Sequence, residues 1–279
     1  MSTTTPTAAA EAAHLFDRVL VGVEDSPASV EAARQAAVLT EHYGELTVLG
    51  VYPPLAPVVY STPEEVDPEE RRRSEQAVAS AHASIERLVP AATKVTRGFA
   101  WQKLIEEAEH EGDTLIVLGS HGLGRIEGML AASTATEVIH KSPCSVLLAR
   151  PAGDLFPQRV VVGLDGSSES SRAYAVARRV ATRFGSTLWP VVACDGAGVD
   201  LEAVRLLTGG RHEELPGEPL QALVAASADA DLLVVGSRCL RGWKALGSVS
   251  ERVAHRAHCS TLIVRGARGA GGARAARAA

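Results

Sequence analysis

The sequence predicts an α/β protein with two tandem domains, each an open, Rossmann-like sheet of five parallel strands. Short, nearly continuous apolar runs alternate with longer helix-like segments along the chain. Such runs are typical of buried parallel strands, whose sheet needs helices on both faces. An internal repeat predicts that there are two domains, and the length of 279 residues suits two domains of ordinary size.

The repeat consists of three blocks that occur twice in the same order. A strand followed by an acidic turn opens each copy, and a strand followed by a Gly-Ser pair and a capped helix closes it. The matching positions are 21–26 with 162–167, Gly119 and Ser120 with Gly236 and Ser237, and Ser133, His140 and Cys144 with Ser248, His255 and Cys259. Three colinear matches indicate a tandem duplication.

The duplication sets the expected domain boundaries. We expect a disordered N-terminus over 1–14, a first domain over 15–150, a linker with two prolines over 151–158 and a second domain over 159–265. The remaining segment, 266–279, contains only Gly, Ala and Arg and is predicted to be disordered.

In the first copy, local patterns predict each element in turn. An apolar run at 18–23 predicts a strand, and the turn 24–27 caps a helix that extends to Tyr43, with Gly44 as its C-cap. Five prolines between 53 and 68 exclude regular structure there. The other predicted elements are strands at 46–52, 94–97, 115–118 and 146–148, helices at 68–88 and 101–111, and a helix that begins after Ser133 with Glu137 in a capping box.

The second copy repeats this order with less chain. Its predicted elements are a strand from Arg159, a helix at 168–184, a strand at 188–194, a short helix at 201–207, a strand from Leu232 and a last strand at 261–264. The matched blocks lie 93 positions apart in the first copy and 69 positions apart in the second. The difference falls on the Pro-rich segment and the charged helix.

Composition narrows the class of protein. A net charge of -5 and a pI near 6.0 give no electrostatic reason to expect nucleic acid as a partner. No apolar run is long enough to span a membrane, and the N-terminus lacks the pattern of a secretory signal. The four cysteines form no CxxC pair, which favours buried thiols in a reducing compartment. We therefore expect a cytoplasmic protein that does not bind membranes.

The residues after the first and fourth strands of each copy predict a nucleotide pocket. Ligands of open parallel sheets bind beyond the carboxyl ends of the strands. At that edge the first copy has Glu24 or Asp25 and the loop 119–124, and the second has Asp165 and the loops around Gly236 and Gly247. An acid can bind ribose hydroxyls or an adenine edge, whereas a Gly/Ser loop at a helix N-terminus suits phosphates.

These residues resemble the universal stress protein family over about 16–265. Nucleotide-binding members have the motif Gly-x2-Gly-x9-Gly-[Ser/Thr] after the fourth strand and an Asp after the first. The first copy has Gly119, Gly122 and Ser133 but Ala132 in place of the third glycine, and Glu24 in place of the Asp. The second copy has the acid, Asp165, together with Gly236, Gly247 and Ser248. It has Cys239 in place of the second glycine, and its loop is two residues shorter.

The resemblance implies the adenine-nucleotide alpha-hydrolase-like fold, with the last strands of the two copies paired as in an internal pseudo-dimer. It implies ATP as the ligand, with Mg²⁺ accompanying it, and a role in the stress response. The implied nucleotide contacts are Val23, Glu24, Val51, Gly119, His121, Gly122, Ala132, Ser133 and Thr134 in the first copy, and Asp165, Gly236, Arg238, Gly247, Ser248 and Val249 in the second.

Three functions stay open at this point. The chain is a nucleotide-binding stress-response module, or a nucleotide-independent module that binds a protein partner, or at most a slow ATP hydrolase, although no residue is an evident base. Further homodimer formation is compatible with each. Among the other conspicuous residues, we expect His140 and His255 to suit the C-terminal ends of their helices and Trp243 to pack.

Overall fold

The computed structural model describes residues 15–40, 44–53, 67–109, 114–120, 134–195, 198–237 and 248–266. We call residues 15–150 the first half and residues 159–265 the second half. The first half has the strands β1 (Arg18–Val23), β2 (Glu45–Tyr52), β3 (Ala91–Arg97), β4 (Thr114–Gly119) and β5 (Ser145–Ala149), and the helices α1 (Pro27–Leu39), α2 (Asp67–Ile85), α3 (Ala100–Ala108) and α4 (Thr134–Lys141). The second half has β6 (Arg159–Leu164), β7 (Thr187–Ala193), β8 (Glu213–Leu215), β9 (Leu232–Gly236) and β10 (Ser260–Val264), and the helices α5 (Ser168–Phe184), α6 (Leu201–Thr208), α7 (Pro219–Ala226) and α8 (Val249–Arg256).

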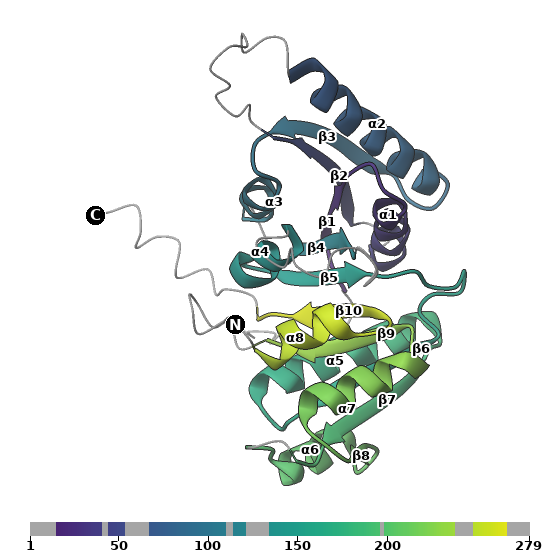
Figure 1. Cartoon of the computed structure of the whole chain (residues 1–279). Helices are drawn as coiled ribbons and strands as arrows, with labels where there is room; N and C mark the ends of the chain where they lie inside the picture. The colour runs from purple at the N-terminus through teal and green to yellow at the C-terminus, as the bar shows by residue number, and fades with distance from the viewer. Residues whose placement is uncertain are drawn as a thin grey trace, which may run out of the picture.

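The strands form one continuous sheet in the order β3-β2-β1-β4-β5-β10-β9-β6-β7-β8. Neighbours within each half are parallel, whereas β5 and β10 are antiparallel, with Leu147 opposite Leu262. The two halves therefore meet strand to strand in the middle of the molecule (Figure 1). The predicted α/β fold with a mostly parallel sheet is confirmed.

Helices cover both faces of the sheet in each half. One core contains buried residues of α1, α2, α5 and α6, and the other contains those of α3, α4, α7 and α8. Every residue of β5 and β10 is buried, because each of these strands has a neighbour on both sides and helices above and below. The continuous apolar runs in the sequence reflect this burial on two faces.

Several helices begin at a residue whose side chain caps them, among them α1 and α5. Ser26 caps α1 by accepting a hydrogen bond from the Ser29 N–H at 3.3 Å, and Pro27 follows it in the first turn. Ser167 caps α5 in the same way, accepting from the Ser170 N–H. The acidic turn of each copy therefore leads directly from a strand into a capped helix.

Some predicted boundaries were wrong. Helix α1 ends at Leu39, where Thr40 is its C-cap, instead of extending to Tyr43 with Gly44 as the cap. Strand β3 begins at Ala91, three residues before the predicted start, and α3 ends at Ala108, three residues before the predicted end. Patterns of apolar residues place an element well but its ends poorly.

The linker packs onto the first half. Phe156 is buried in the core, and the Arg34 guanidinium donates to the carbonyls of Ala152 and Gly153, both at 3.2 Å. The linker, which connects β5 to β6, is therefore held against α1. Within the described residues, no helix is both long and apolar enough to cross a membrane.

Candidate functional site

Each half has a switch point at the carboxyl edge of its sheet. In the first half the chain runs outward from β1 to β2 and β3, then returns to the other side of β1 with β4 and β5. The second half does the same around β6, with β9 on its other side. Ligands of open α/β sheets bind where the order reverses, between β1 and β4 or between β6 and β9.

The first switch point brings together three of the predicted site residues. Val23 ends β1 and is buried, while Glu24 follows it and is exposed. Gly119 ends the neighbouring strand β4, one step past the pair formed by Gly22 and Leu118. The Ser29 hydroxyl accepts a hydrogen bond from the Glu24 N–H at 2.9 Å, which fixes the backbone of the acidic residue. Sequence reasoning missed this role of Ser29.

Two further predicted residues lie at the same edge. Val51 is near the end of β2, the strand beside β1, and is half-buried. Thr134 is the first residue of α4, whose N-terminus leads the chain back from the loop after β4. His121, Gly122, Ala132 and Ser133 lie outside the described residues. Glu137, expected in a capping box, lies 2.6 Å from Lys141 Nζ.

The first glycine of each motif is required by packing. A Cβ on Gly119 would lie 2.6 Å from the Ala28 carbonyl oxygen, and one on Gly236 would lie 2.6 Å from the Glu169 carbonyl oxygen. In both halves the glycine lets the first turn of α1 or α5 approach the neighbouring strand end. A glycine here therefore indicates a helix–strand contact and is not by itself evidence for a phosphate contact.

The second switch point has the predicted Asp165, but its carboxylate is engaged. Asp165 Oδ1 accepts from the Ser167 N–H at 2.9 Å and from the Ser167 hydroxyl at 2.5 Å. The Asp200 N–H donates to the Asp165 carbonyl at 3.0 Å, and a Cβ on Gly166 would lie 2.6 Å from the Asp200 carbonyl oxygen. The start of α6 therefore packs directly over the end of β6, a consequence of the shortened chain between β7 and β8.

The second switch point also carries an additional negative charge. Glu169 lies in the first turn of α5, beside Gly236, where the first half has Ala28. A hydrogen bond from its own backbone N–H, together with Ser168 and Arg172, lowers the pKa of the Glu169 carboxyl. This helix N-terminus is therefore already paired with an anion.

The remaining predicted residues of the second half are divided between described and undescribed segments. Ser248 caps α8 by accepting a hydrogen bond from the Glu251 N–H at 3.3 Å, and Val249 begins the helix. Arg238 and Gly247 lie outside the described residues, as do Cys239 and Trp243.

The helices that follow the two glycine loops end in cross-half caps. Arg150 donates to the carbonyl of Ala254 in the last turn of α8 at 2.6 Å and to that of Cys259, just before β10, at 3.1 Å. Arg265, its repeat equivalent, donates to the carbonyls of Ile139 and Ser142 at the end of α4. Two long cations therefore stabilise the C-terminal ends where we expected His140 and His255 to act.

The described cysteines differ in their surroundings. Burial raises the pKa of the Cys144 thiol and raises that of Cys259 to about 12, so neither is a thiolate at neutral pH. Cys194 is exposed, so the prediction of a buried thiol was wrong there. No group of three His, Cys, Asp or Glu side chains within the described segments could hold a metal ion.

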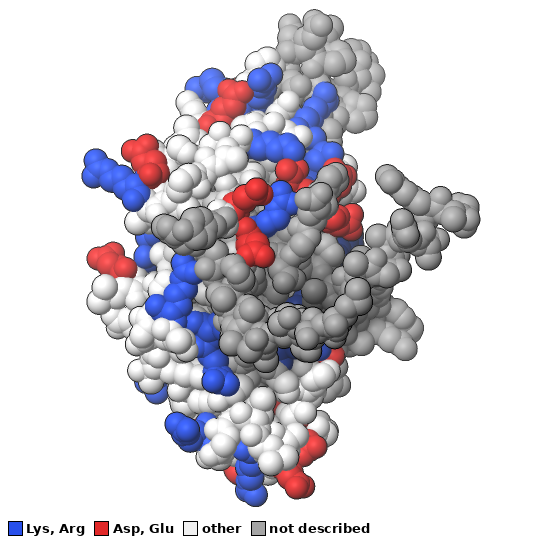
Figure 2. Space-filling view, turned by 180° about the vertical axis from the view of Figure 1, so that it is seen from behind, with Lys and Arg blue, Asp and Glu red and all other residues white. Residues whose placement is uncertain are grey.

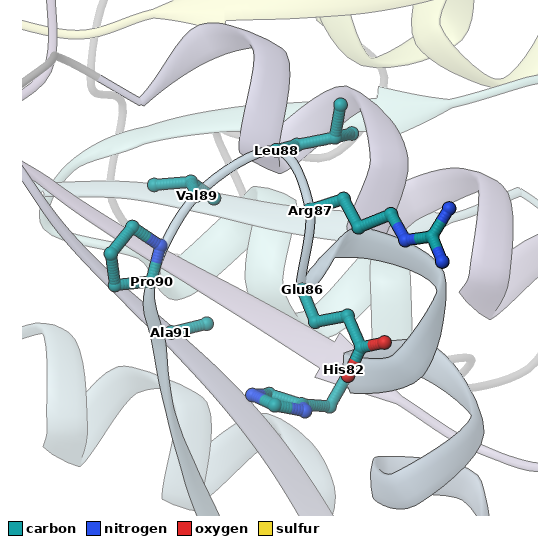
Figure 3. Close-up of a pocket in the computed structure, with 7 residues that line it drawn as sticks. All are labelled: His82, Glu86, Arg87, Leu88, Val89, Pro90 and Ala91. Carbon is teal, nitrogen blue, oxygen red and sulfur yellow. The ribbon is translucent and has the colours of Figure 1, made fainter.

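A pocket of about 420 Å³, drawn in Figure 3, lies away from both switch points. It lies under the turn from α2 to the start of β3, lined by His82, Glu86, Arg87, Leu88, Val89, Pro90 and Ala91. Because β3 begins there, this pocket is at the amino edge of the sheet, opposite the switch points.

The molecular face in Figure 2 carries both acidic and basic side chains, interspersed over the first half.

The fold defines an α/β protein with two halves of the same strand order, each with a switch point at the carboxyl edge of a parallel sheet, the edge at which ligands of such sheets bind. The model of the universal stress protein family matches residues 15–150 and 210–265, which is more than half of the chain. The chain therefore belongs to the universal stress protein family. The unmatched stretch includes β6, α5 and β7, which correspond in sheet order to β1, α1 and β2.

Proteins that resemble this chain in sequence or in structure are also universal stress proteins. Universal stress protein Rv2623 of Mycobacterium tuberculosis is 30% identical over 181 residues, which are 54% of this chain and 61% of that protein. Universal stress protein Rv1996 of the same species is 25% identical over 299 residues, covering 88% of this chain and 94% of the relative. The crystal structure of a universal stress protein from Archaeoglobus fulgidus has a TM-score of 0.73 and 22% identity, covering 92% of this chain and 98% of its own, which shows the shared fold.

Proposed function

We propose that this protein binds an adenine nucleotide, such as ATP, at the switch point of its first half and acts as a nucleotide-dependent regulator in a stress response. The observation that carries the proposal is the contrast between the two switch points. Glu24 is exposed at the end of β1, beside Gly119, whereas the end of β6 is covered by the start of α6, where Asp200 packs against Gly166 and donates to the Asp165 carbonyl.

The charged residues near the two switch points also favour phosphate binding by the first half. The first turn of α5, which packs against Gly236, carries the acidic residue Glu169, whereas the side chain beside Gly119 is the methyl group of Ala28. Like charges at close range disfavour binding, and the first turn of α1 has no acidic residue. The residues of the first half therefore fit the ligand: Glu24 would accept from the ribose hydroxyls, and the N-terminus of α4 at Thr134 would face the phosphates. Magnesium would be held chiefly by the phosphates.

The second half then serves as a built-in partner. Its strand β10 gives β5 the neighbour that a second copy of a single-domain protein would supply, so the two halves act as a pseudo-dimer. The covered switch point of the second half also favours a second candidate function, in which the chain is a nucleotide-independent module that binds a protein partner.

Titration of ATP into nucleotide-free protein separates these functions. We expect Glu24→Ala to weaken binding by about 10- to 100-fold, because a hydrogen bond to a charged group contributes about 1.5–3 kcal/mol. Glu169→Ala is the matched control in the second half and should not weaken binding. Absence of binding by the unmodified protein at millimolar ATP would leave the interaction module as the better account.

A further inference from the structure

Helices α4 and α8 meet across the junction of the two halves. Both lie on the same face of the sheet, above β5 and β10 (Figure 1). His140 Nε2 of α4 lies 2.8 Å from Glu251 Oε1 of α8, and His255 Nε2 of α8 lies 3.4 Å from Thr136 Oγ1 of α4. The last turn of each helix therefore contacts the first turn of the other.

The two contacts are equivalent positions of the repeat. Thr136 corresponds to Glu251 and His140 corresponds to His255, each 115 positions later. The duplication has kept a histidine in both helices but changed what each one faces. His140 faces a carboxylate in the second half, and His255 faces a neutral hydroxyl in the first half.

The position of Thr136 connects His255 with the proposed nucleotide site. Thr136 is the third residue of α4, and Thr134 at its start is one of the predicted phosphate contacts. The first residues of a helix carry backbone N–H groups without partners inside the helix, and these are the groups that bind anions. A side chain from the second half therefore reaches the anion-binding turn of the first half.

The surroundings of His255 disfavour the protonated form of its ring. Burial lowers the pKa of His255, Glu251 on the same helix raises it, and Arg150 and His140 lower it further. Thr136 adds no charge, and α7, which packs against α8, has no titratable side chain. An anion at the start of α4 would add negative charge on the side of the ring that faces Thr136, and this favours protonation.

We propose that His255 is a positioning residue through which the second half controls phosphate binding by the first half, so that nucleotide binding is coupled to uptake of a proton. The inference rests on the proposed function. By linkage, a ligand that favours the protonated ring binds more tightly to the protonated protein. Nucleotide affinity should then increase as the pH falls toward the range in which His255 titrates.

Calorimetric titration of ADP into the full chain tests the coupling. Measurements at several pH values between 5.5 and 8, in buffers of different ionisation enthalpy, give the number of protons taken up with the ligand. His140→Gln is the matched control, because it alters the equivalent histidine that faces Glu251. Proton changes of ADP itself are the same for every variant and cancel in the comparison.

We expect the unmodified protein and His140→Gln to take up a fraction of a proton that His255→Gln does not. The ratio of affinities between the unmodified protein and His255→Gln should rise as the pH falls, by up to about tenfold for each unit by which binding raises the pKa of His255. Thr136→Val, which removes the contact and leaves the histidine, should reduce the uptake.

Two negative results are distinguishable. If the unmodified protein binds neither ADP nor ATP at any pH, the proposed function is wrong and the coupling falls with it. If it binds ADP but His255→Gln takes up the same number of protons with the same pH dependence, the coupling is overturned and the nucleotide site stands. Circular dichroism of each variant before titration excludes misfolding as the cause.

Discussion

At the scale of single residues, the glycines of the motif have a structural role that limits their use as probes of binding. Gly119 and Gly236 each let a helix approach a strand end too closely for a side chain. Glu24 and Glu169 are better probes, because both are surface side chains at equivalent edges of the two halves.

Gly119→Ala should therefore destabilise the protein even without nucleotide. Its Cβ would lie 2.6 Å from the Ala28 carbonyl oxygen, which is backbone and can move only with α1. We expect the free energy of unfolding in urea to fall by about 1–3 kcal/mol. Gly153→Ala, at a position with no atom within 4 Å of the added Cβ, should change it by less than about 0.5 kcal/mol. Equal stability of the two variants would contradict this packing.

His255 should also make stability depend on pH. Its pKa is lowered in the folded protein, so the unfolded chain binds more protons just below its ordinary value of about 6.5. The contribution of neutral His255 to the free energy of unfolding is complete above this pH and is lost as the pH falls further. Thermal unfolding between pH 8 and 5 should show a smaller decrease in Tm for His255→Gln than for the unmodified protein. A parallel decrease in both would show that other groups are responsible.

At the scale of elements, the junction depends on contacts that reach from one half into the other. Arg150 and Arg265 cap the ends of α8 and α4, and their backbone N–H groups donate to the Ser260 and Ser145 hydroxyls at 3.0 and 3.1 Å. Buried Gln35 of α1 donates to the Arg150 carbonyl at 2.7 Å and accepts from the Ser260 hydroxyl at 2.8 Å. Polar groups near β5 and β10 are thus paired across the halves.

Arg150→Ala should loosen this junction. The change leaves the carbonyls of Ala254 and Cys259 without the guanidinium that they accept from, inside a buried region. We expect a loss of about 3 kcal/mol or more in urea unfolding, because charged hydrogen bonds are among the strongest in proteins. Arg71→Ala removes an exposed side chain that pairs with Glu75 on α2 and should cost less than about 0.5 kcal/mol. Similar small effects in both would show that the caps contribute little.

The sequence predicts the elements much better than their contacts. Apolar runs locate the strands, and Ser26, Ser167 and Ser248 mark helix starts, because these signals are local. The caps from Arg150 and Arg265 join residues more than a hundred positions apart, and no local pattern encodes them. The packing of Asp200 on Gly166 also depends on how a shortened loop closes. The sequence could therefore place the candidate residues at the carboxyl edge of the sheet, where Val23, Glu24 and Gly119 lie, but it could not predict the difference between the two copies.

At the scale of the whole molecule, the two halves have the same strand order and different edges. Helix α2 has 19 residues where α6 has eight, and the shorter connection brings α6 onto the end of β6. Glu169 replaces the small residue found in the first half. One half keeps an exposed acid at its switch point, and the other supplies the strand and helix that complete the junction.

The stoichiometry of nucleotide binding to the full chain tests this account most directly. Calorimetric titration of ATP into nucleotide-free protein should give one site per chain, with affinity that falls in Glu24→Ala and persists in Glu169→Ala. Two equivalent sites, or one site that survives Glu24→Ala and is strengthened by Glu169→Ala, would contradict the assignment to the first half.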